Sequence, residues 1–373
     1  MEQLSLRELA VYRARLRGCL LGGAIGDALG HPIEGLSLPG IRARYGEHGV
    51  TGPVPDLDGV TGRISDETQL TLFTAEGWLS AYARAMARGL GGAETAMVHD
   101  AYQAWQETQT YPEPPPRDGL RHRSGRLREE RWLYARRGPG PATAAGLRES
   151  HVPVPWIPVD GTPGPVNPDS KGCGAVVRSA PFGFTGSDPK WCFELAARCA
   201  QITHGHPTGY YAAGAFAAMI SHLVNGGSVE AAVLMSMELL AGYPGHEETT
   251  AALRRAVDLA RTGPATPSKV ESLGAGWIAE EALAVGLYTA LAPTEYREDR
   301  TPVEIALLTA VNHSGDSDST GSVCGNLLGA HYGDCLLPAH WLQQIEGRAV
   351  IAALADDFAA EVHPGESRPW LYH

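Results

Sequence analysis

Apolar side chains recur along the chain at the spacing of α-helices. Leu9, Tyr12, Leu16 and Leu20 are three or four residues apart, which places them on one helical face. Alternating, strand-like runs are few and no β-α-β rhythm is present, so we predict an all-α fold. Further stretches with helical periodicity cover about 93–108, 190–204, 208–224, 228–242, 247–262, 276–291 and 339–361.

Two sequence signals predict where helices begin. Ser65 is a suitable N-cap, followed by acidic residues in the first turn of a helix that continues through Leu79. The segment 301–304 (Thr-Pro-Val-Glu) has the arrangement of a capping box with proline at the first helical position. It opens a helix that should end near His313.

The first helix carries small residues at every fourth position, at Gly22, Gly26 and Gly30. Residues four apart lie on one helical face. This spacing predicts that the backbone of another segment approaches closely there.

Length and composition are compatible with one large domain. A hydrophobic share of 43% is sufficient for a sizeable core, and we predict a single domain over 1–373. The helical pattern is interrupted at about 110–168, a segment rich in proline, arginine and glycine with a basic run from Arg117 to Arg137. Long irregular segments within a domain are often functional or mobile. We interpret most of this one as a surface insertion.

Charge and cysteine usage narrow the functional classes. With 42 acidic and 30 basic residues the net charge is −12, which argues against a general nucleic-acid or membrane-surface binder. Residues 1–17 lack an apolar signal core, and no stretch is apolar enough to span a membrane. No C-x-x-C pair occurs among the cysteines, which favours reduced, mostly buried thiols in a cytoplasmic protein over a disulfide framework or a zinc site. Our default expectation for the oligomeric state is a monomer. The six cysteines are Cys19, Cys173, Cys192, Cys199, Cys324 and Cys335.

Two acidic, hydroxyl-rich clusters remain as candidates for chemistry. Residues 65–68 read Ser-Asp-Glu-Thr, and residues 316–320 read Asp-Ser-Asp-Ser-Thr behind the turn residue Gly315, between two predicted helices. Asp316 and Asp318 are two apart, so an extended backbone would point both to one side. Hard oxygen ligands of this kind suit Mg²⁺, Mn²⁺ or Ca²⁺ and not zinc. Taken alone, each cluster is also explained by ordinary helix capping, because acids are favoured at helix N-termini.

Five motifs in order resemble the ADP-ribosylglycohydrolase family. Residues 26–30 (Gly-Asp-Ala-Leu-Gly) followed by Glu34 resemble its N-terminal motif, and the two acidic clusters resemble its S/T-D-D-T and G-D-x-D-T/S-x-G motifs. The segment 169–181 resembles its ligand loop, and Thr203-His204 its T-H motif. The resemblance covers about 15–360 and implies an orthogonal multi-helix bundle with two Mg²⁺ ions, or Mn²⁺, in a central cleft.

The resemblance also implies roles for individual residues. The implied catalytic residues are Glu34, Asp66, Glu67 and Asp316. The implied metal ligands are Ser65, Asp66, Glu67, Asp316, Asp318 and Ser319. The implied ligand-binding residues are Ser170, Lys171, Gly172, Cys173, Gly174 and His204. Asp27 is expected to brace a helix end instead of reacting.

The chain departs from the family pattern at four site positions, of which Ser65 and Ser319, where threonine is frequent, are mild changes. Glu67 stands where aspartate is usual, which retains the carboxylate but adds a methylene, and Cys173 replaces an asparagine found in some relatives.

The resemblance implies an ADP-ribosylhydrolase that cleaves the bond between ADP-ribose and an acceptor, such as an arginine or serine side chain of a modified protein. Glu67 keeps open a catalytically weak or inactive ADP-ribose-binding protein. A structural protein in which both clusters are helix caps is the third alternative.

Overall fold

The computed structural model describes residues 4–116, 125–295 and 297–364, and sixteen α-helices lie in these ranges. Only isolated β-bridges occur there, such as Gly172 with Ile278, so the predicted all-α fold is confirmed. The helices are α1 (Leu6–Gly30), α2 (Leu38–Tyr45), α3 (Asp66–Arg88), α4 (Glu94–Thr108), α5 (Pro141–Arg148), α6 (Gly174–Val177), α7 (Pro189–Ala200), α8 (Pro207–Val224), α9 (Val229–Leu240), α10 (Glu247–Ala260), α11 (Pro267–Glu271), α12 (Ala279–Leu291), α13 (Pro302–Val311), α14 (Ser317–Tyr332), α15 (Ala339–Leu342) and α16 (Arg348–Val362). Short 3-10 turns cover His31–Ile33, Leu127–Glu129, Arg131–Leu133, Ala180–Gly183 and Asp334–Leu336.

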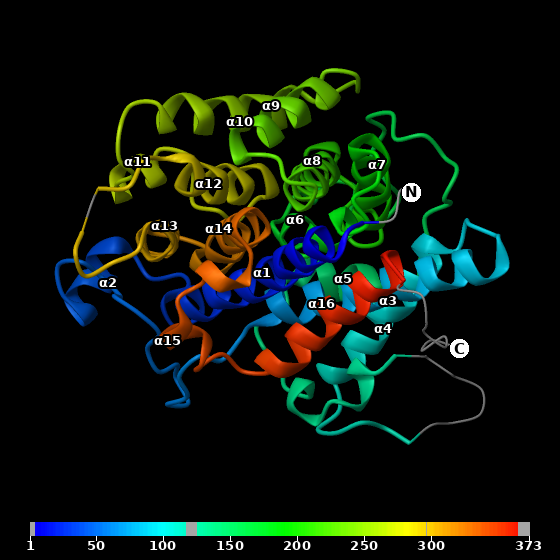
Figure 1. Cartoon of the computed structure of the whole chain (residues 1–373), viewed down its shortest axis with the longest axis horizontal. Helices are drawn as coiled ribbons and strands as arrows, with labels where there is room; N and C mark the ends of the chain where they lie inside the picture. The colour runs from blue at the N-terminus through cyan, green and yellow to red at the C-terminus, as the bar shows by residue number, and fades with distance from the viewer. Residues whose placement is uncertain (1–3, 117–124, 296, 365–373) are drawn as a thin grey trace.

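Helices α1 and α14 form the centre of the molecule and run antiparallel to each other (Figure 1). Their backbones touch along the glycine stripe of α1. A Cβ atom at Gly26 would lie 1.9 Å from the carbonyl oxygen of Gly321, and one at Gly22 would lie 2.3 Å from that of Gly325. The close approach predicted from the glycine spacing is therefore confirmed. We call this contact the α1–α14 seam.

The other helices surround the seam in crossed directions (Figure 1). Helices α12 and α13 pack against α14, while α3 and α16 pack against α1. Helices α9 and α10 lie at one edge of the bundle, beyond α8 and α12, and α4 covers α3 on the other side. The seam brings the C-terminal end of α1 next to the N-terminal end of α14, where one of the acidic clusters begins.

Most predicted helices are present, with two differences. The helix predicted over 339–361 is broken, because α15 ends at Leu342 and α16 starts only at Arg348. Between them Gly347 has a φ of +67°, and the amide of Glu346 donates to the carbonyl of Gly62 at 2.9 Å. The helix predicted over 190–204 ends earlier, at Ala200.

The segment predicted as an irregular insertion contains regular structure. Helix α5 and two 3-10 turns lie within 125–168, and residues 117–124 of its basic run are outside the described residues. Helix α5 begins at Pro141, which suits the first helical turn because proline has no amide hydrogen to lose there.

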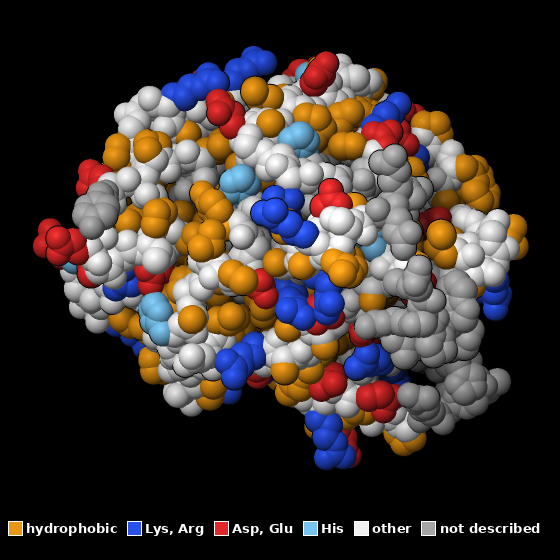
Figure 2. Space-filling model, viewed as in Figure 1, with side chains coloured by type: hydrophobic (Ala, Val, Ile, Leu, Met, Phe, Trp, Pro, Cys, Tyr) orange, Lys and Arg blue, Asp and Glu red, His pale blue; other side chains and the backbone are white. Residues whose placement is uncertain are grey.

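The surface shown in Figure 2 carries acidic and basic side chains interspersed among apolar ones, without one broad basic field. Within the described part of the chain, we find no helix with both the length and the apolar character needed to cross a membrane. All six cysteines are free thiols.

Candidate functional site

The first acidic cluster is positioned by the buried carboxylate of Asp27, near the end of α1. The amide of Ser65 donates to both Asp27 oxygens at 3.0 Å, and the amide of Thr68 donates to Oδ2 at 3.1 Å. The Ser65 hydroxyl in turn accepts from the amide of Glu67 at 3.1 Å. Ser65 is therefore the N-cap of α3, and Asp27 braces the same helix end, as predicted.

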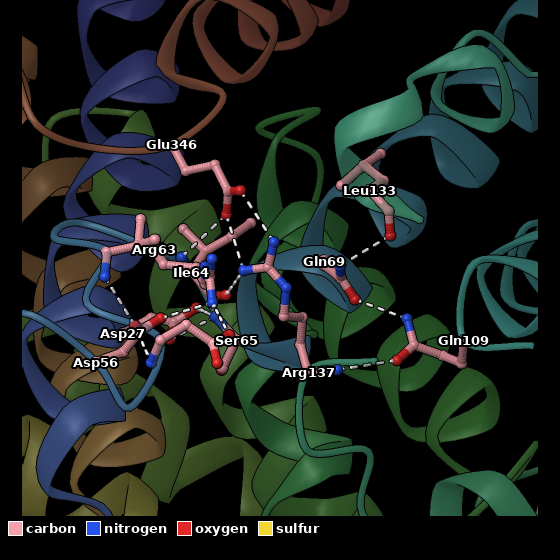
Figure 3. Close-up of polar contacts among 12 residues, drawn as sticks. Asp27, Asp56, Arg63, Ile64, Ser65, Gln69, Gln109, Leu133, Arg137 and Glu346 are labelled. Atoms are coloured by element: carbon pink, nitrogen blue, oxygen red, sulfur yellow. Dashed lines mark hydrogen bonds and ion pairs between the residues drawn. The ribbon is translucent and has the colours of Figure 1, made fainter. Parts of the chain in front are cut away.

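A residue of the 110–168 segment supports this cluster from the other side (Figure 3). The guanidinium of Arg137 donates to the carbonyl of Ile64 at 2.9 Å and forms an ion pair with Glu346 at 2.9 Å. The carbonyl of Arg137 accepts from the amide of Asp66 at 3.0 Å. One arginine thus joins the start of α3 to the segment before α16.

The second acidic cluster is the N-terminus of α14, not a linker between helices. Asp316 is the N-cap, its side chain accepts from the amide of Ser319 at 3.3 Å, and Asp318 lies in the first turn. The extended backbone assumed for this stretch is therefore wrong from Ser317 onward. Gly315 precedes the cap with a φ of +144°, and a Cβ atom there would lie 2.0 Å from the carbonyl oxygen of Ala275. Only glycine fits that turn.

The two clusters meet in space, although some 250 residues separate them in the chain. The Ser319 hydroxyl donates to Oε1 of Glu67 at 2.8 Å. Ligand atoms of Glu67, Cys173 and Asp316 lie within 4.8 Å of one another, and those of His31, Glu34 and Asp318 form a second such group. We call the first of these the Cys173 group and the second the His31 group.

The cluster is strongly acidic and shielded from water. Burial, reinforced by the neighbouring carboxylates, raises the pKa of Asp66, of Glu67 and of Asp316 well above the usual range. Arg63, the basic residue nearest in sequence, forms ion pairs with Asp56 and Asp58 instead. Carboxylates this close are stable in ionised form only when cations lie among them.

His31 and Glu34 border the cluster at the end of α1. Nδ1 of His31 lies 3.7 Å from Oδ2 of Asp318, and this contact raises the pKa of the imidazole. Glu34 is exposed as a residue, but desolvation of its carboxyl group and the charge of Asp318 raise its pKa to about 7. Among the predicted catalytic residues, Glu34 is the one at the solvent-exposed rim.

The predicted ligand loop lies beside the Cys173 group and over the imidazole of His204. A Cβ atom at Gly172 would be 3.2 Å from Nε2 of His204, and one at Gly174 would be 3.7 Å from its Cε1. The hydroxyl of Thr203 lies 2.7 Å from Nδ1 of His204. Burial, aided by Arg178, lowers the pKa of His204 to about 3, so the ring is neutral.

Lys171 and Ser170 connect this loop to neighbouring helices, while Oγ of Ser170 stays near Gly172, 3.8 Å from the position of a Cβ atom there. The ammonium of Lys171 forms ion pairs with Glu248 at 2.5 Å and with Glu280 at 2.6 Å, which fasten the loop to α10 and α12. The carbonyl of Ser170 accepts from the amide of His206 at 3.3 Å, which joins the loop to the start of α8. Lys171 therefore has two carboxylate partners instead of an open side chain.

Sequence reasoning missed two residues of this site and part of the role of a third. His31 directly follows the glycine stripe and lies three residues before Glu34, a spacing that places both near one helical end. Arg137 had no local signal, because its partners are distant in sequence. Cys173 was assigned only to the ligand loop, whereas its Sγ lies 2.9 Å from Oδ2 of Asp316.

Comparisons with known proteins place these features in context. The family model for ADP-ribosylglycohydrolase matches residues 8–367. The chain is 25% identical over 336 residues to the ADP-ribosyl-[dinitrogen reductase] glycohydrolase of Rhodospirillum rubrum, covering 89% of this chain and 90% of that protein. It is 26% identical over 356 residues to an uncharacterized protein of Archaeoglobus fulgidus, covering 91% and 94%. A solved ADP-ribosylglycohydrolase-related protein complex shares the fold, with a TM-score of 0.62, 23% identity and coverage of 95% of this chain and 99% of that one.

Proposed function

Because the chain belongs to the ADP-ribosylglycohydrolase family, we propose that it hydrolyses the glycosidic bond between ADP-ribose and an acceptor. The acceptor class we favour is an arginine or serine side chain of a modified protein. The observation that supports this proposal is the meeting of the two acidic clusters beside the glycine loop and His204.

The side chains present fit divalent cations. Six carboxylate or hydroxyl residues of the two clusters are buried together, and Oε2 of Glu67 is buried without a hydrogen-bond partner. Oxygen donors of this kind suit Mg²⁺ or Mn²⁺. The residues that would hold two such ions are Ser65, Asp66, Glu67, Asp316, Asp318 and Ser319. When bound, the cations would supply Lewis acidity and orient the ribose hydroxyls.

The remaining residues have roles that follow from their positions. Gly172 and Gly174 let the loop lie close to the imidazole of His204, because a Cβ atom at either residue would lie within 3.7 Å of that ring. We propose that this loop contacts the pyrophosphate of the substrate. The neutral imidazole of His204 offers an uncharged hydrogen-bonding group beside that loop. Hydrolysis also requires that a proton reach the leaving atom. Among the carboxyl groups proposed as catalytic, namely those of Glu34, Asp66, Glu67 and Asp316, Glu34 is the one that reaches the rim.

The test is release of ADP-ribose from modified protein by the purified full chain with Mg²⁺. Asp316→Asn should lower the rate by more than about 100-fold, since even residues behind metal ligands contribute about 10–100-fold. Asp258→Asn is the matched control, because Asp258 is an exposed carboxylate that contacts Arg261. Rates that are equal in the two variants and insensitive to a chelator would contradict the proposal.

The same assay distinguishes a second candidate, an ADP-ribose-binding protein with little or no turnover. The observation that favours it is Glu67, whose longer side chain already accepts from Ser319. Tight binding of ADP-ribose, without its release from arginine-, serine- or O-acetyl-linked substrates, would support this alternative.

A further inference from the structure

We propose that the Cys173 group binds a thiophilic divalent cation, of the Zn²⁺ or Co²⁺ class, through the Cys173 sulfur. This inference rests on the proposed function, because it concerns one of the two cation positions proposed at the two acidic clusters. It differs from the expectation of Mg²⁺ at both positions. Mg²⁺ selects oxygen donors, whereas thiolate selects softer ions.

The geometry of the three side chains suits a small tetrahedral cation. Ligand atoms of Glu67, Cys173 and Asp316 all lie within 4.8 Å of one another. In a tetrahedral zinc site the sulfur and oxygen ligands are about 3.6 Å apart, given bond lengths of about 2.3 and 2.1 Å. Sγ of Cys173 and Oδ2 of Asp316 are now 2.9 Å apart and form a hydrogen bond. To hold a cation in place of this hydrogen bond, the two atoms need to move apart by less than about 1 Å.

The carboxylate of Glu67 provides a second, independent indication of a ligand. Its Oε1 accepts from Ser319, but Oε2 is buried and has no hydrogen-bond partner. The residue is only 7% exposed. A buried, unpaired carboxylate oxygen is unfavourable unless it is compensated by a cation or a hydrogen-bond donor. Glu67 is a member of the same three-residue group as Cys173.

The sulfur is held at this place by the backbone around it. The amide of Cys173 donates to the carbonyl of Trp277 at 3.1 Å, and its carbonyl accepts from the amides of Val176 and Val177. These bonds fix the residue between the start of α6 and the segment before α12. The thiol therefore faces the cluster without a rearrangement of the loop, and its proton passes to solvent when the cation binds.

The His31 group differs in its donors. It offers one imidazole nitrogen and two carboxylates, and Glu34 lies at the rim. Imidazole is a borderline ligand that also binds Mn²⁺ and Fe²⁺, so this position is less selective than one with sulfur. The two positions are therefore expected to prefer different cations.

The test is a Co²⁺ titration of the metal-free full chain, followed by absorption spectroscopy. Wild type should develop a sulfur-to-cobalt charge-transfer band, and Cys173→Ser should lack it. Cys335→Ser is the matched control and should keep the band, because Cys335 is an exposed thiol near one carboxylate, Asp334. In competition with a chelator, Cys173→Ser should weaken Zn²⁺ binding at least about tenfold and change Mn²⁺ binding much less.

A measurement on the unaltered chain provides the second readout. X-ray absorption of the Zn²⁺-loaded wild type should show one sulfur neighbour at about 2.3 Å. Co²⁺ binding without a sulfur band, or a band that survives in Cys173→Ser, would overturn this inference and leave the cation centre intact. Failure of the chain to bind Co²⁺, Mn²⁺ or Mg²⁺ at all would overturn both the inference and the proposed cation-dependent function.

Discussion

The site formed by the two acidic clusters has two sides that are built by different kinds of contact. On one side, the α1–α14 seam places His31 and Glu34 next to Asp318 through direct contact of two helix backbones. On the other side, polar side-chain contacts from the 125–178 region hold the start of α3. The most important of these joins Arg137 to Ile64 and Glu346.

This difference determines how each side responds to substitution. A backbone contact leaves no room for an added atom, but it has no ionisable group to lose. A polar contact tolerates small changes in shape, but it fails when one partner is removed or changes its charge. The seam should therefore be sensitive to added volume and the opposite side to lost partners and to pH.

The largest expected effect is that of Gly26→Ala in the seam. The added Cβ would lie 1.9 Å from the Gly321 carbonyl, so the helices must separate. We expect a loss of about 3 kcal/mol or more in unfolding free energy, although helix propensity alone favours alanine by about 1 kcal/mol. Denaturant unfolding measures this change.

The control for that variant is Gly91→Ala on the exposed segment before α4. Its Cβ would meet no atom closer than 3.3 Å, and the nearest atom is the flexible tip of Glu94. We expect a change within about 0.5 kcal/mol. Equal stability losses in the two variants would show that the seam is not specifically intolerant of volume.

A smaller effect is expected when a partner is removed on the polar side. Arg137→Met deletes the hydrogen bond to Ile64 and leaves Glu346 without its ion-pair partner, while Arg137 itself is only 9% exposed. We expect a loss of about 3 kcal/mol at most, together with weaker cation binding, since the start of α3 is released. Arg261→Met, in an exposed ion-pair cluster, should change the unfolding free energy by less than about 1 kcal/mol.

The measurement is a double-mutant cycle with Glu346→Gln. Losses that simply add would mean that Arg137 and Glu346 act independently, contrary to their ion pair. Cation affinity measured on the same proteins separates a global loss of stability from a displaced start of α3.

The two sides also differ in how well the sequence predicts them. The glycine stripe of the seam is a local pattern with one physical meaning, and it is present in the structure. The Ser65 cap and the capping box at Thr301 are also local patterns that the structure contains, although neither lies in the seam. The order of motifs predicted that both acidic clusters belong to one site. The seam is thus readable from spacing alone.

The polar side was largely unpredictable, because its contacts join residues far apart in the chain. Arg137 meets Glu346 across 209 positions, and nothing in either local sequence indicates the partner. The broken helix near Gly347 was missed for the same reason. Apolar residues continue at helical spacing through that region, and the break is fixed by the contact of Glu346 with Gly62.

The smallest expected effect is a pH dependence of stability, caused by Glu76, the residue of α3 that binds the backbone of residues 125–127. Oε1 of Glu76 accepts from the amides of Arg126 at 2.6 Å and Leu127 at 3.0 Å. Burial outweighs these bonds and raises the pKa of Glu76 to about 7. Because the folded chain binds this proton more tightly than the unfolded chain does, stability should fall as the pH rises from about 4.5 to 7. The loss is on the order of 2 kcal/mol.

Glu76→Gln retains the amide-accepting oxygen and removes the titration. The unfolding free energy of Glu76→Gln, relative to that of wild type, should therefore increase as the pH rises from 5 to 8. Glu8→Gln serves as a control, because hydrogen bonds from Ser5 lower the pKa of Glu8. Its difference from wild type should stay constant between pH 5 and 8 and change, with the opposite sign, only below about pH 4.5. A constant difference between Glu76→Gln and wild type across this range would mean that Glu76 does not titrate there. The polar side would then differ from the seam only in its response to lost partners.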